Sequence, residues 1–172
     1  QFYLSDAHLA ESVGRFVSAA LASDGAAVVV ATADHVTEID RYLAQRLGDG
    51  SDVERARIDG RYLCLDAPTT LALLLRDSQP DPDRFTEIIG GAVARALAAA
   101  GGAGPRVAVY GELVALLSAE GNHDGALALE RMWNELIATA PISLHCGYPL
   151  RSFSRIDDAR ALQAICDAHT AV

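Results

Sequence analysis

Residues 106–149, which read RVAVYGELVALLSAEGNHDGALALERMWNELIATAPISLHCGYP, contain two short runs of strand-forming residues, at 107–110 and 142–146. Between these runs lie two segments whose apolar residues recur at helical spacing, separated by a turn at Gly121-Asn122. Parallel strands need long crossover connections, and helices usually provide them. The segment therefore predicts a strand–helix–helix–strand unit of an α/β domain.

The same alternation of strands and helices extends along the rest of the chain. The run AVVVA at 27–31 has the continuous apolar character of a buried parallel strand, and RYLCLD at 61–66 predicts a second strand. Helical spacing and capping residues predict helices at 6–22, after Thr32 or Asp34, after Asp66, after Asp81, up to about 119, around Trp133 and after Asp157 or Asp158. The order α-β-α-β-α-α-β-α-α-β-α is typical of a three-layer α/β sandwich with a mostly parallel sheet.

Three segments fall outside this pattern. Residues 1–3 are the expected end of a further strand. Residues 48–59 are polar and rich in turn-forming residues, with room for one helical turn. The Gly-rich stretch at 101–104 precedes a strand, so it is a flexible link and not a phosphate loop, which would follow one.

The balance of charges excludes several classes of protein. All 14 basic residues are arginine, so no lysine is available for a phosphate loop or for a Schiff base with pyridoxal phosphate. The formal net charge of −9 argues against direct nucleic-acid binding, which needs clustered basic residues. No apolar run approaches the ~20 residues that span a bilayer. We expect no cofactor and no association with a membrane.

The cysteine and methionine content bears on the setting of the domain. The three cysteines, Cys64, Cys146 and Cys166, are widely spaced, which favours a reducing, cytoplasmic location. Met132 is the sole methionine, so no initiator residue is present. We therefore expect a single domain over residues 1–172 that is excerpted from a longer protein.

Polar side chains follow two of the predicted strands. Glu112 comes just after the run at 107–110, and Thr32 and His35 follow the run at 27–31. In an open parallel sheet, ligands bind in the crevice beyond the carboxyl ends of the strands. Glu112 has two interpretations there. In one, it acts as a general base or binds a cation or an arginine. In the other, it accepts N–H bonds at the start of its own helix.

A second group of unusual residues lies on one helical face. Glu130, Trp133 and Asn134 are spaced at i, i+3 and i+4, so their side chains are neighbours. In one interpretation, Trp133 is a core residue and Glu130 pairs with an arginine. In the other, Trp133 forms the aromatic wall of a site for an apolar ligand.

The stretch DSQPDPDRF at 77–85 is ordinarily a turn followed by a helix cap. Arg84 lies in the first turn of the helix predicted there. We expect its guanidinium to reach a carboxylate such as that of Asp66 or Glu112.

Four residues suggest a metal hypothesis: His145, Cys146, Cys166 and His169. Cys166-x-x-His169 would put two ligands on adjacent helical turns, but neighbours on a strand point to opposite faces, so His145 and Cys146 cannot both face one metal. We expect core packing and a helix-terminal histidine here, with no metal ion and no Cys–His nucleophile. The phosphate-loop, dinucleotide-binding, nucleophile-elbow and zinc-protease motifs are also missing from the sequence.

A set of motifs spread over the chain resembles one known family. The motifs are VVATxxH (29–35), GRYxxLDA (60–67), PDxxRF (80–85), YGELVALL (110–117), EGN (120–122), LExxWNxL (129–136) and CxYP (146–149). Together they resemble the MEDS family, the methanogen/methylotroph, dichloromethane-repressor-type sensory domain. The resemblance runs from residues 1–3 almost to the last residue.

The resemblance implies a RecA-like fold of the circadian-clock (KaiC) branch that lacks the phosphate loop. It also implies that the domain is fused to, or works with, a histidine-kinase-like ATPase, an anti-sigma-type regulator or a helix-turn-helix repressor module. Members of the family are proposed to sense small hydrocarbon-like molecules. No catalytic residues come with the resemblance.

We therefore expect a non-catalytic, cytoplasmic sensory domain of a bacterial signalling or transcription regulator, with a small apolar ligand bound at the strand ends. Two alternatives stay open. One is a protein-interaction module that docks a kinase-like or sigma-factor partner, and the other is a residual nucleotide-binding enzyme that uses Glu112. The residues expected to line the ligand site are Thr32, His35, Asp66, Arg84, Phe85, Glu112, Trp133, Asn134 and Tyr148.

Overall fold

A four-stranded, all-parallel sheet forms the centre of the domain. The computed structural model describes residues 2–3, 5–48, 50–101 and 106–149. The strands lie in the order β3-β2-β6-β7, and their bounds are Ala26–Ala31 (β2), Tyr62–Asp66 (β3), Val107–Gly111 (β6) and Ile142–Cys146 (β7). In register, Val29 of β2 lies between Cys64 of β3 and Tyr110 of β6. The four predicted strands and their parallel arrangement are confirmed.

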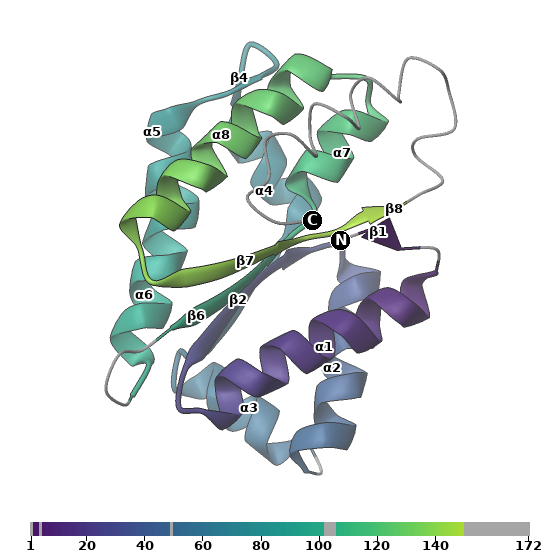
Figure 1. The fold of residues 1–172 in the computed structure, drawn as a ribbon, viewed down its shortest axis with the longest axis vertical. Coiled ribbons are helices and arrows are strands. Elements are labelled where there is room, and N and C mark those ends of the chain that lie inside the picture. Colours follow the sequence, from purple (N-terminus) through teal and green to yellow (C-terminus); the bar gives the residue numbers. More distant parts are fainter. Residues whose placement is uncertain (1, 4, 49, 102–105, 150–172) are drawn as a thin grey trace.

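Three helices cover one face of this sheet: α1 (Asp6–Ala22), α2 (Ala33–Leu47) and α3 (Ser51–Ile58) (Figure 1). Ala27, Val29 and Ala31 of β2 alternate onto this face and pack with apolar side chains of α1 and α2. The helix α3 has eight residues, so the expectation of one helical turn within 48–59 was too short. Its buried residues, Val53 and Ala56, explain why this otherwise polar segment is helical.

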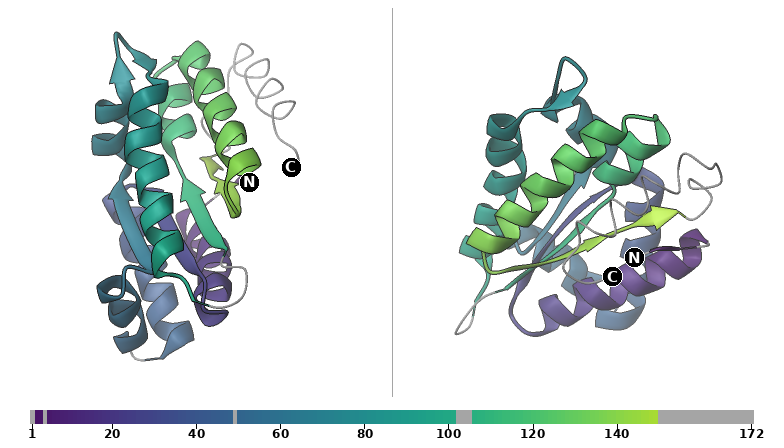
Figure 2. Two further views of the ribbon diagram at one scale, coloured as in Figure 1. Left: turned by 90° about the vertical axis from the view of Figure 1, so that its left-hand side faces the viewer. Right: turned by 45° about the horizontal axis from the view of Figure 1, so that its top comes forward.

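The opposite face is covered by the remaining helices, as two further views make clear (Figure 2). Val28 and Val30 point to this side, and Trp133 and Ile89 pack in the same core. The sheet thus lies between two helical layers, which confirms the three-layer α/β sandwich. The helical segments of this side are α4 (Ala67–Leu74), α5 (Pro82–Phe85), the π-helix η1 (Thr86–Gly90), α6 (Gly91–Ala99), α7 (Leu113–Ala119) and α8 (His123–Thr139).

Two short strand pairs complete the described fold. β1 (Phe2–Tyr3) pairs in parallel with β8 (Tyr148–Pro149), which confirms the strand expected at the start of the chain. β4 (Leu75–Arg76) and β5 (Gln79–Pro80) form an antiparallel hairpin. The central turn residues, Asp77 and Ser78, have φ of 50° and 64°, as a tight hairpin turn with right-handed twist requires. The sequence predicted a turn here but not the hairpin.

Side-chain caps start four of the described helices, α1, α4, α5 and α8. Asp66 accepts a hydrogen bond from the Thr69 N–H at the start of α4, and Asp81 accepts from two N–H groups at the start of α5. Thr32 holds the same position before α2, but its side chain makes no capping bond. The N-terminus of α2 must therefore find its acceptor elsewhere. The helix predicted after Asp157 or Asp158 lies outside the described residues.

The connections place a topological switch point at the carboxyl ends of the strands. From β2 the chain moves outward to β3, and it then returns to the other side of β2 to form β6 and β7. The helix that follows β2 lies on one face of the sheet and the helix that follows β6 lies on the other. The strand order therefore reverses between β2 and β6, and such a switch point is where ligands bind in sheets of this kind.

Candidate functional site

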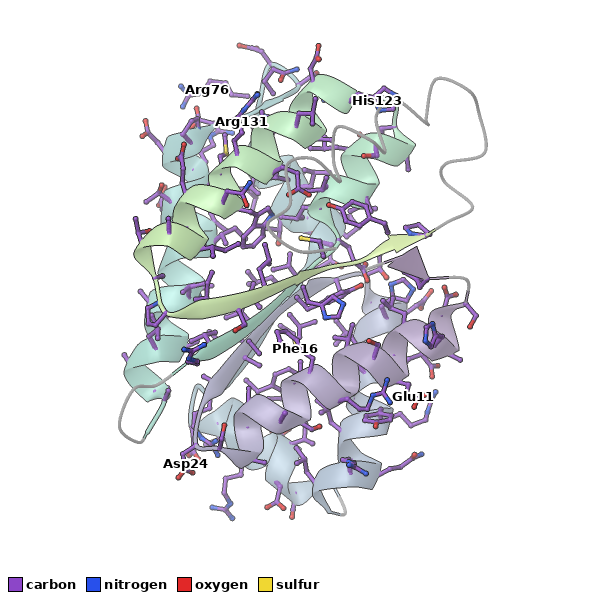
Figure 3. All side chains as sticks on the ribbon, viewed as in Figure 1. Glu11, Phe16, Asp24, Arg76, His123 and Arg131 are labelled. Atoms are coloured by element: carbon purple, nitrogen blue, oxygen red, sulfur yellow. The ribbon has the colours of Figure 1, made fainter. Side chains whose placement is uncertain are left out.

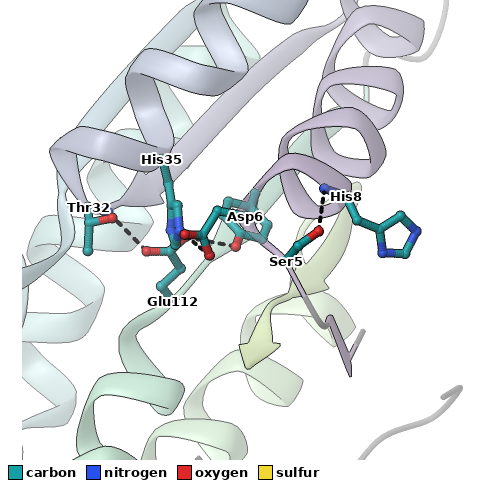
Figure 4. A network of polar contacts seen from close by, with 7 residues as sticks. Ser5, Asp6, His8, Thr32, His35 and Glu112 are labelled. Atoms are coloured by element: carbon teal, nitrogen blue, oxygen red, sulfur yellow. Dashed lines mark hydrogen bonds and ion pairs between the residues drawn. The ribbon is translucent and has the colours of Figure 1, made fainter. Parts of the chain in front are cut away.

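The carboxylate of Glu112 occupies the switch point. Glu112 follows β6 and is only 4% exposed. One oxygen, Oε2, accepts the backbone N–H of Thr32 at 2.9 Å. The other, Oε1, accepts the hydroxyl of Tyr110 at 2.8 Å and lies 2.6 Å from Nδ1 of His35 (Figure 4). A buried carboxylate is tolerated only when it has such partners. The three groups around Glu112 therefore stabilise its buried carboxylate.

Glu112 supplies the acceptor that α2 lacks. It stands at the N-cap position of α7, yet its side chain makes no capping bond to that helix. Its carboxylate instead reaches the N-terminus of α2 and accepts the Thr32 N–H there. Of the two interpretations of Glu112, the one in which it accepts N–H bonds of its own helix was wrong. Its physical reason, attraction of an anion to a helix N-terminus, applies to the neighbouring helix.

His35 connects the Glu112 carboxylate to the amino-terminal part of the chain. Its Nε2 lies 3.5 Å from the carboxylate of Asp6, the first residue of α1, and its ring meets the edge of Tyr3 with centroids 6.1 Å apart. The side chain of His35 is 13% exposed and that of Asp6 is 51% exposed. The hydrogen bond to Glu112 raises the pKa of His35 above its usual value, against the opposing effect of burial. The imidazolium form is thus favoured between two carboxylates.

Tyr110 reaches Glu112 because the chain beside it is a glycine. A Cβ atom at Gly147 would collide with the Tyr110 hydroxyl, so a side chain at this position would displace it. Burial raises the pKa of Tyr110 well above its usual value, and the adjacent Glu112 charge acts in the same direction. The phenol therefore remains neutral and donates its hydrogen to Glu112.

A second buried carboxylate lies at the end of β7 and β8. Glu130 of α8 is 2% exposed and accepts a hydrogen bond from the hydroxyl of Tyr148. The thiol of Cys146 lies in the same region, and burial raises its pKa. The phenol of Tyr148 likewise has a raised pKa, chiefly because it is buried. The Cys146 thiol and the Tyr148 phenol are therefore neutral at ordinary pH, and the cysteine does not form a reactive thiolate.

Trp133 is a core residue that packs against a buried aromatic neighbour, Phe85. It is 1% exposed, and its ring meets Phe85 edge to face with centroids 5.1 Å apart. The ring also lies 3.5 Å from where a Cβ atom at Gly111 would stand, directly before Glu112. Asn134 follows on α8 and is half-buried.

The structure thus divides the nine expected ligand residues into groups. Thr32, His35 and Glu112 come together at the switch point. Phe85 and Trp133 form a separate pair, and Tyr148 lies with Glu130. Asp66 caps α4 at the end of β3. No single site holds all nine.

The expectation for Arg84 was wrong. Its guanidinium donates to the carbonyl oxygens of Leu73 at 3.2 Å and Leu75 at 2.7 Å, instead of meeting Asp66 or Glu112. The last carbonyls of a helix lack partners within it and carry partial negative charge, so a cation at this end of α4 is favourable. Arg84 is therefore a structural cap.

Three members of the switch-point cluster were not predicted. Tyr110 stands two residues before Glu112, and the alternation of a strand places such residues on the same side, so a signal for it existed. Asp6 and Tyr3 contact His35 only through the tertiary fold, and nothing local in the sequence marks them.

A groove of about 270 Å³ lies between η1 and α8. Phe85, Met132 and Leu136 give it an apolar lining, and Phe85 connects it to Trp133. One wall is a π-helix, a segment that is frequently found at functional sites. The full lining consists of Pro82, Phe85, Thr86, Gly90, Met132, Glu135, Leu136 and Thr139.

The expected strand alternation at His145 and Cys146 is confirmed. The ring of His145 packs against Phe16, which is labelled on α1 in Figure 3, with centroids 5.4 Å apart. Cys146 joins the core on the other face of the sheet. Burial lowers the pKa of His145 to about 4. Within the described residues, no group of three or more His, Cys, Asp or Glu side chains is arranged to hold a metal ion. Cys166 and His169 lie outside those residues.

These features define a three-layer α/β domain whose switch point is filled by its own carboxylate. The model of the MEDS family, described as the methanogen/methylotroph, DcmR sensory domain, matches residues 1–170. The chain belongs to the MEDS family and is a sensory domain, as its motifs predicted. Searches of curated proteins and of solved structures find no match. Among the described helices, none combines the length and apolar character that a bilayer crossing requires.

Proposed function

We propose that this chain is a non-catalytic sensory domain of a bacterial signalling or transcription regulator, and that it binds a small apolar molecule in the groove between η1 and α8. The observation that carries the proposal is the position of Phe85. Its ring lines the groove on one side and contacts Trp133 on the other. A ligand in the groove would therefore touch a side chain that packs directly on the core.

The chemistry of the groove suits an apolar ligand better than the switch point does. Both oxygens of Glu112 already accept hydrogen bonds, and an apolar molecule there would strip a buried carboxylate of its partners, which is costly. In the groove, the hydroxyls of Thr86 and Thr139 donate to carbonyls of their own helices at 2.9 Å. The groove thus presents few unsatisfied donors to a ligand.

The hydrogen bonds that occupy both oxygens of Glu112 also support a non-catalytic role. A general base needs a lone pair that faces the substrate, and the protein's own donors take up the carboxylate. For the same reason we place residual nucleotide chemistry last among the alternatives. We assign the output to a fused or partner histidine-kinase-like ATPase, anti-sigma or helix-turn-helix module, because a sensory domain acts through another unit.

Two neighbouring glycines allow a matched test. Gly90 lines the groove, and a Cβ atom there would lie 3.8 Å from the nearest side-chain atom, so a larger side chain can enter the groove. Gly91 is the next residue, has the same helical backbone and is not part of the lining. Gly90→Leu should fill the groove, whereas Gly91→Leu should leave it open.

The readout is the fluorescence of Trp133, the sole tryptophan, titrated with small alkanes, aromatics and halogenated alkanes. We expect saturable changes for the wild type and for Gly91→Leu, and none for Gly90→Leu. Thermal shift with the same compounds checks that the signal reports binding. Saturation that survives in Gly90→Leu would contradict the groove as the site, and no response from any compound would contradict apolar sensing.

A further inference from the structure

We propose that His35 is a proton-dependent latch that holds the amino-terminal segment, β1 with the first turn of α1, against the switch point. The proposal does not depend on the ligand groove. It rests on the placement of one imidazole between two carboxylates that belong to different parts of the fold, Asp6 of α1 and Glu112 after β6.

The hydrogen bonds show which proton of His35 can leave. Nδ1 lies 2.6 Å from Oε1 of Glu112, and an ionised carboxylate only accepts hydrogen bonds. Nδ1 therefore keeps its hydrogen whether the ring is charged or neutral. The proton that dissociates is the one on Nε2, which faces Asp6 at 3.5 Å.

Loss of this proton breaks one arm of the cluster and weakens the other, because the charge on the ring also strengthens the bond to Glu112. With Nε2 protonated, the ring attracts the Asp6 carboxylate; without it, a lone pair faces that carboxylate and the attraction is lost. The arm to Glu112 persists, supported by Tyr110 and by the Thr32 N–H. The Asp6 side chain is about half exposed and can turn to water at little cost.

The charged and aromatic groups around His35 come from three elements of the fold. The carboxylate of Asp6 comes from α1, and the ring of Tyr3 comes from β1. Glu112 and Tyr110 come from the end of β6, and Tyr110 stays neutral because burial raises its pKa. The bond to Glu112 raises the pKa of His35, which brings its titration toward neutral pH.

The segment that the latch holds begins with a short strand. β1 has two residues, and its described pairing is with the equally short β8. Such a pair of strands is marginal in water without further support. Tyr3 is 5% exposed, and its ring meets the ring of His35 in a T-shaped contact. The position of the segment therefore depends in part on the imidazole of His35. Deprotonation of His35 should therefore loosen β1 and the first turn of α1 while the sheet stays intact.

Hydrogen–deuterium exchange measured over about pH 6 to pH 9 and corrected for intrinsic rates tests the latch. In the wild type, protection of the peptide covering residues 2–9 should fall by about threefold or more as the pH rises, the effect of losing one partly exposed ion pair. Protection of α8 should not change over the same range.

Three variants separate the latch from other causes. His35→Asn keeps a donor toward Glu112 but has none toward Asp6, so protection should be low at every pH. Asp6→Asn pairs with either state of the ring and should remove the pH step without disturbing Glu112, which keeps the test valid if His35→Asn fails to fold. His8→Asn is the matched control on an exposed histidine of α1 and should keep the step. A flat wild-type profile, a step that survives in Asp6→Asn, or a step lost in His8→Asn would overturn the proposal.

Discussion

The carboxylate of Glu112 accepts the backbone N–H of Thr32, which lies 80 residues earlier in the chain, at 2.9 Å. This contact joins the ends of β2 and β6 across the point where the strand order reverses. In many sheets of this type the same place is a ligand site. In this protein a side chain of the domain itself accepts one N–H at the N-terminus of α2.

Removing this carboxylate should destabilise the domain strongly. Glu112→Ala leaves a buried N–H and a buried phenol without their acceptor and should lower the free energy of unfolding by about 3–5 kcal/mol. Glu112→Gln keeps one acceptor oxygen and should cost less. Urea denaturation measures both, and Glu120→Ala, at an exposed glutamate two turns along α7, is the control. A loss for Glu112→Ala no larger than that of the control would contradict the role assigned to Glu112.

The glycine at 147 should be required because of Tyr110. Gly147→Ala pushes the Tyr110 hydroxyl away from Glu112 and should cost about 2–4 kcal/mol in the free energy of unfolding. In a Tyr110→Phe background, which removes the hydroxyl, the same substitution should cost clearly less. A double-mutant cycle by denaturant unfolding gives the difference. Additive effects of the two changes would show that the collision is not with the hydroxyl.

The stability of the domain should depend on pH through His35. The pKa of His35 is raised in the folded state, so its stabilising contribution is fully present below the unfolded value of about 6.5 and is lost as the pH rises through the folded pKa. The free energy of unfolding of the wild type should therefore decline relative to that of His35→Asn as the pH rises from about 6.5 through the raised pKa of His35. Parallel curves for the two proteins over this range would contradict a raised pKa.

The elements of the fold with strong local signals could be predicted from the sequence. The apolar run at 27–31, the capping acids Asp66 and Asp81 and the turn before α8 each carry their own signal, and all are present in the structure. The hairpin β4–β5 could not be predicted, because it depends on positive φ at Asp77 and Ser78, which are not glycines. The length of α3 depends on burial of two small apolar residues, which is a tertiary effect.

In the candidate site, too, local signals could be predicted from the sequence and tertiary contacts could not. Thr32, His35 and Glu112 were expected at one edge because the ends of parallel strands meet there, and they do. The acceptor for α2 could not be assigned, because Thr32 and Glu112 are each plausible caps of their own helices and only the distance between the strands decides. Arg84 was misplaced for a similar reason: its partners are carbonyls of Leu73 and Leu75, which exist as free acceptors only once α4 ends.

The central claim, that the groove between η1 and α8 binds a small apolar ligand, can be tested with one resonance. Met132 is the sole methionine and lines the groove. A ¹³C-methyl-methionine sample therefore gives a single signal, which can be followed while small alkanes, aromatics and halogenated alkanes are added. We predict a saturable shift in the wild type and in Gly91→Leu that is absent in Gly90→Leu. A Met132 signal that does not move with any of these compounds, in a folded wild-type protein, would contradict the account.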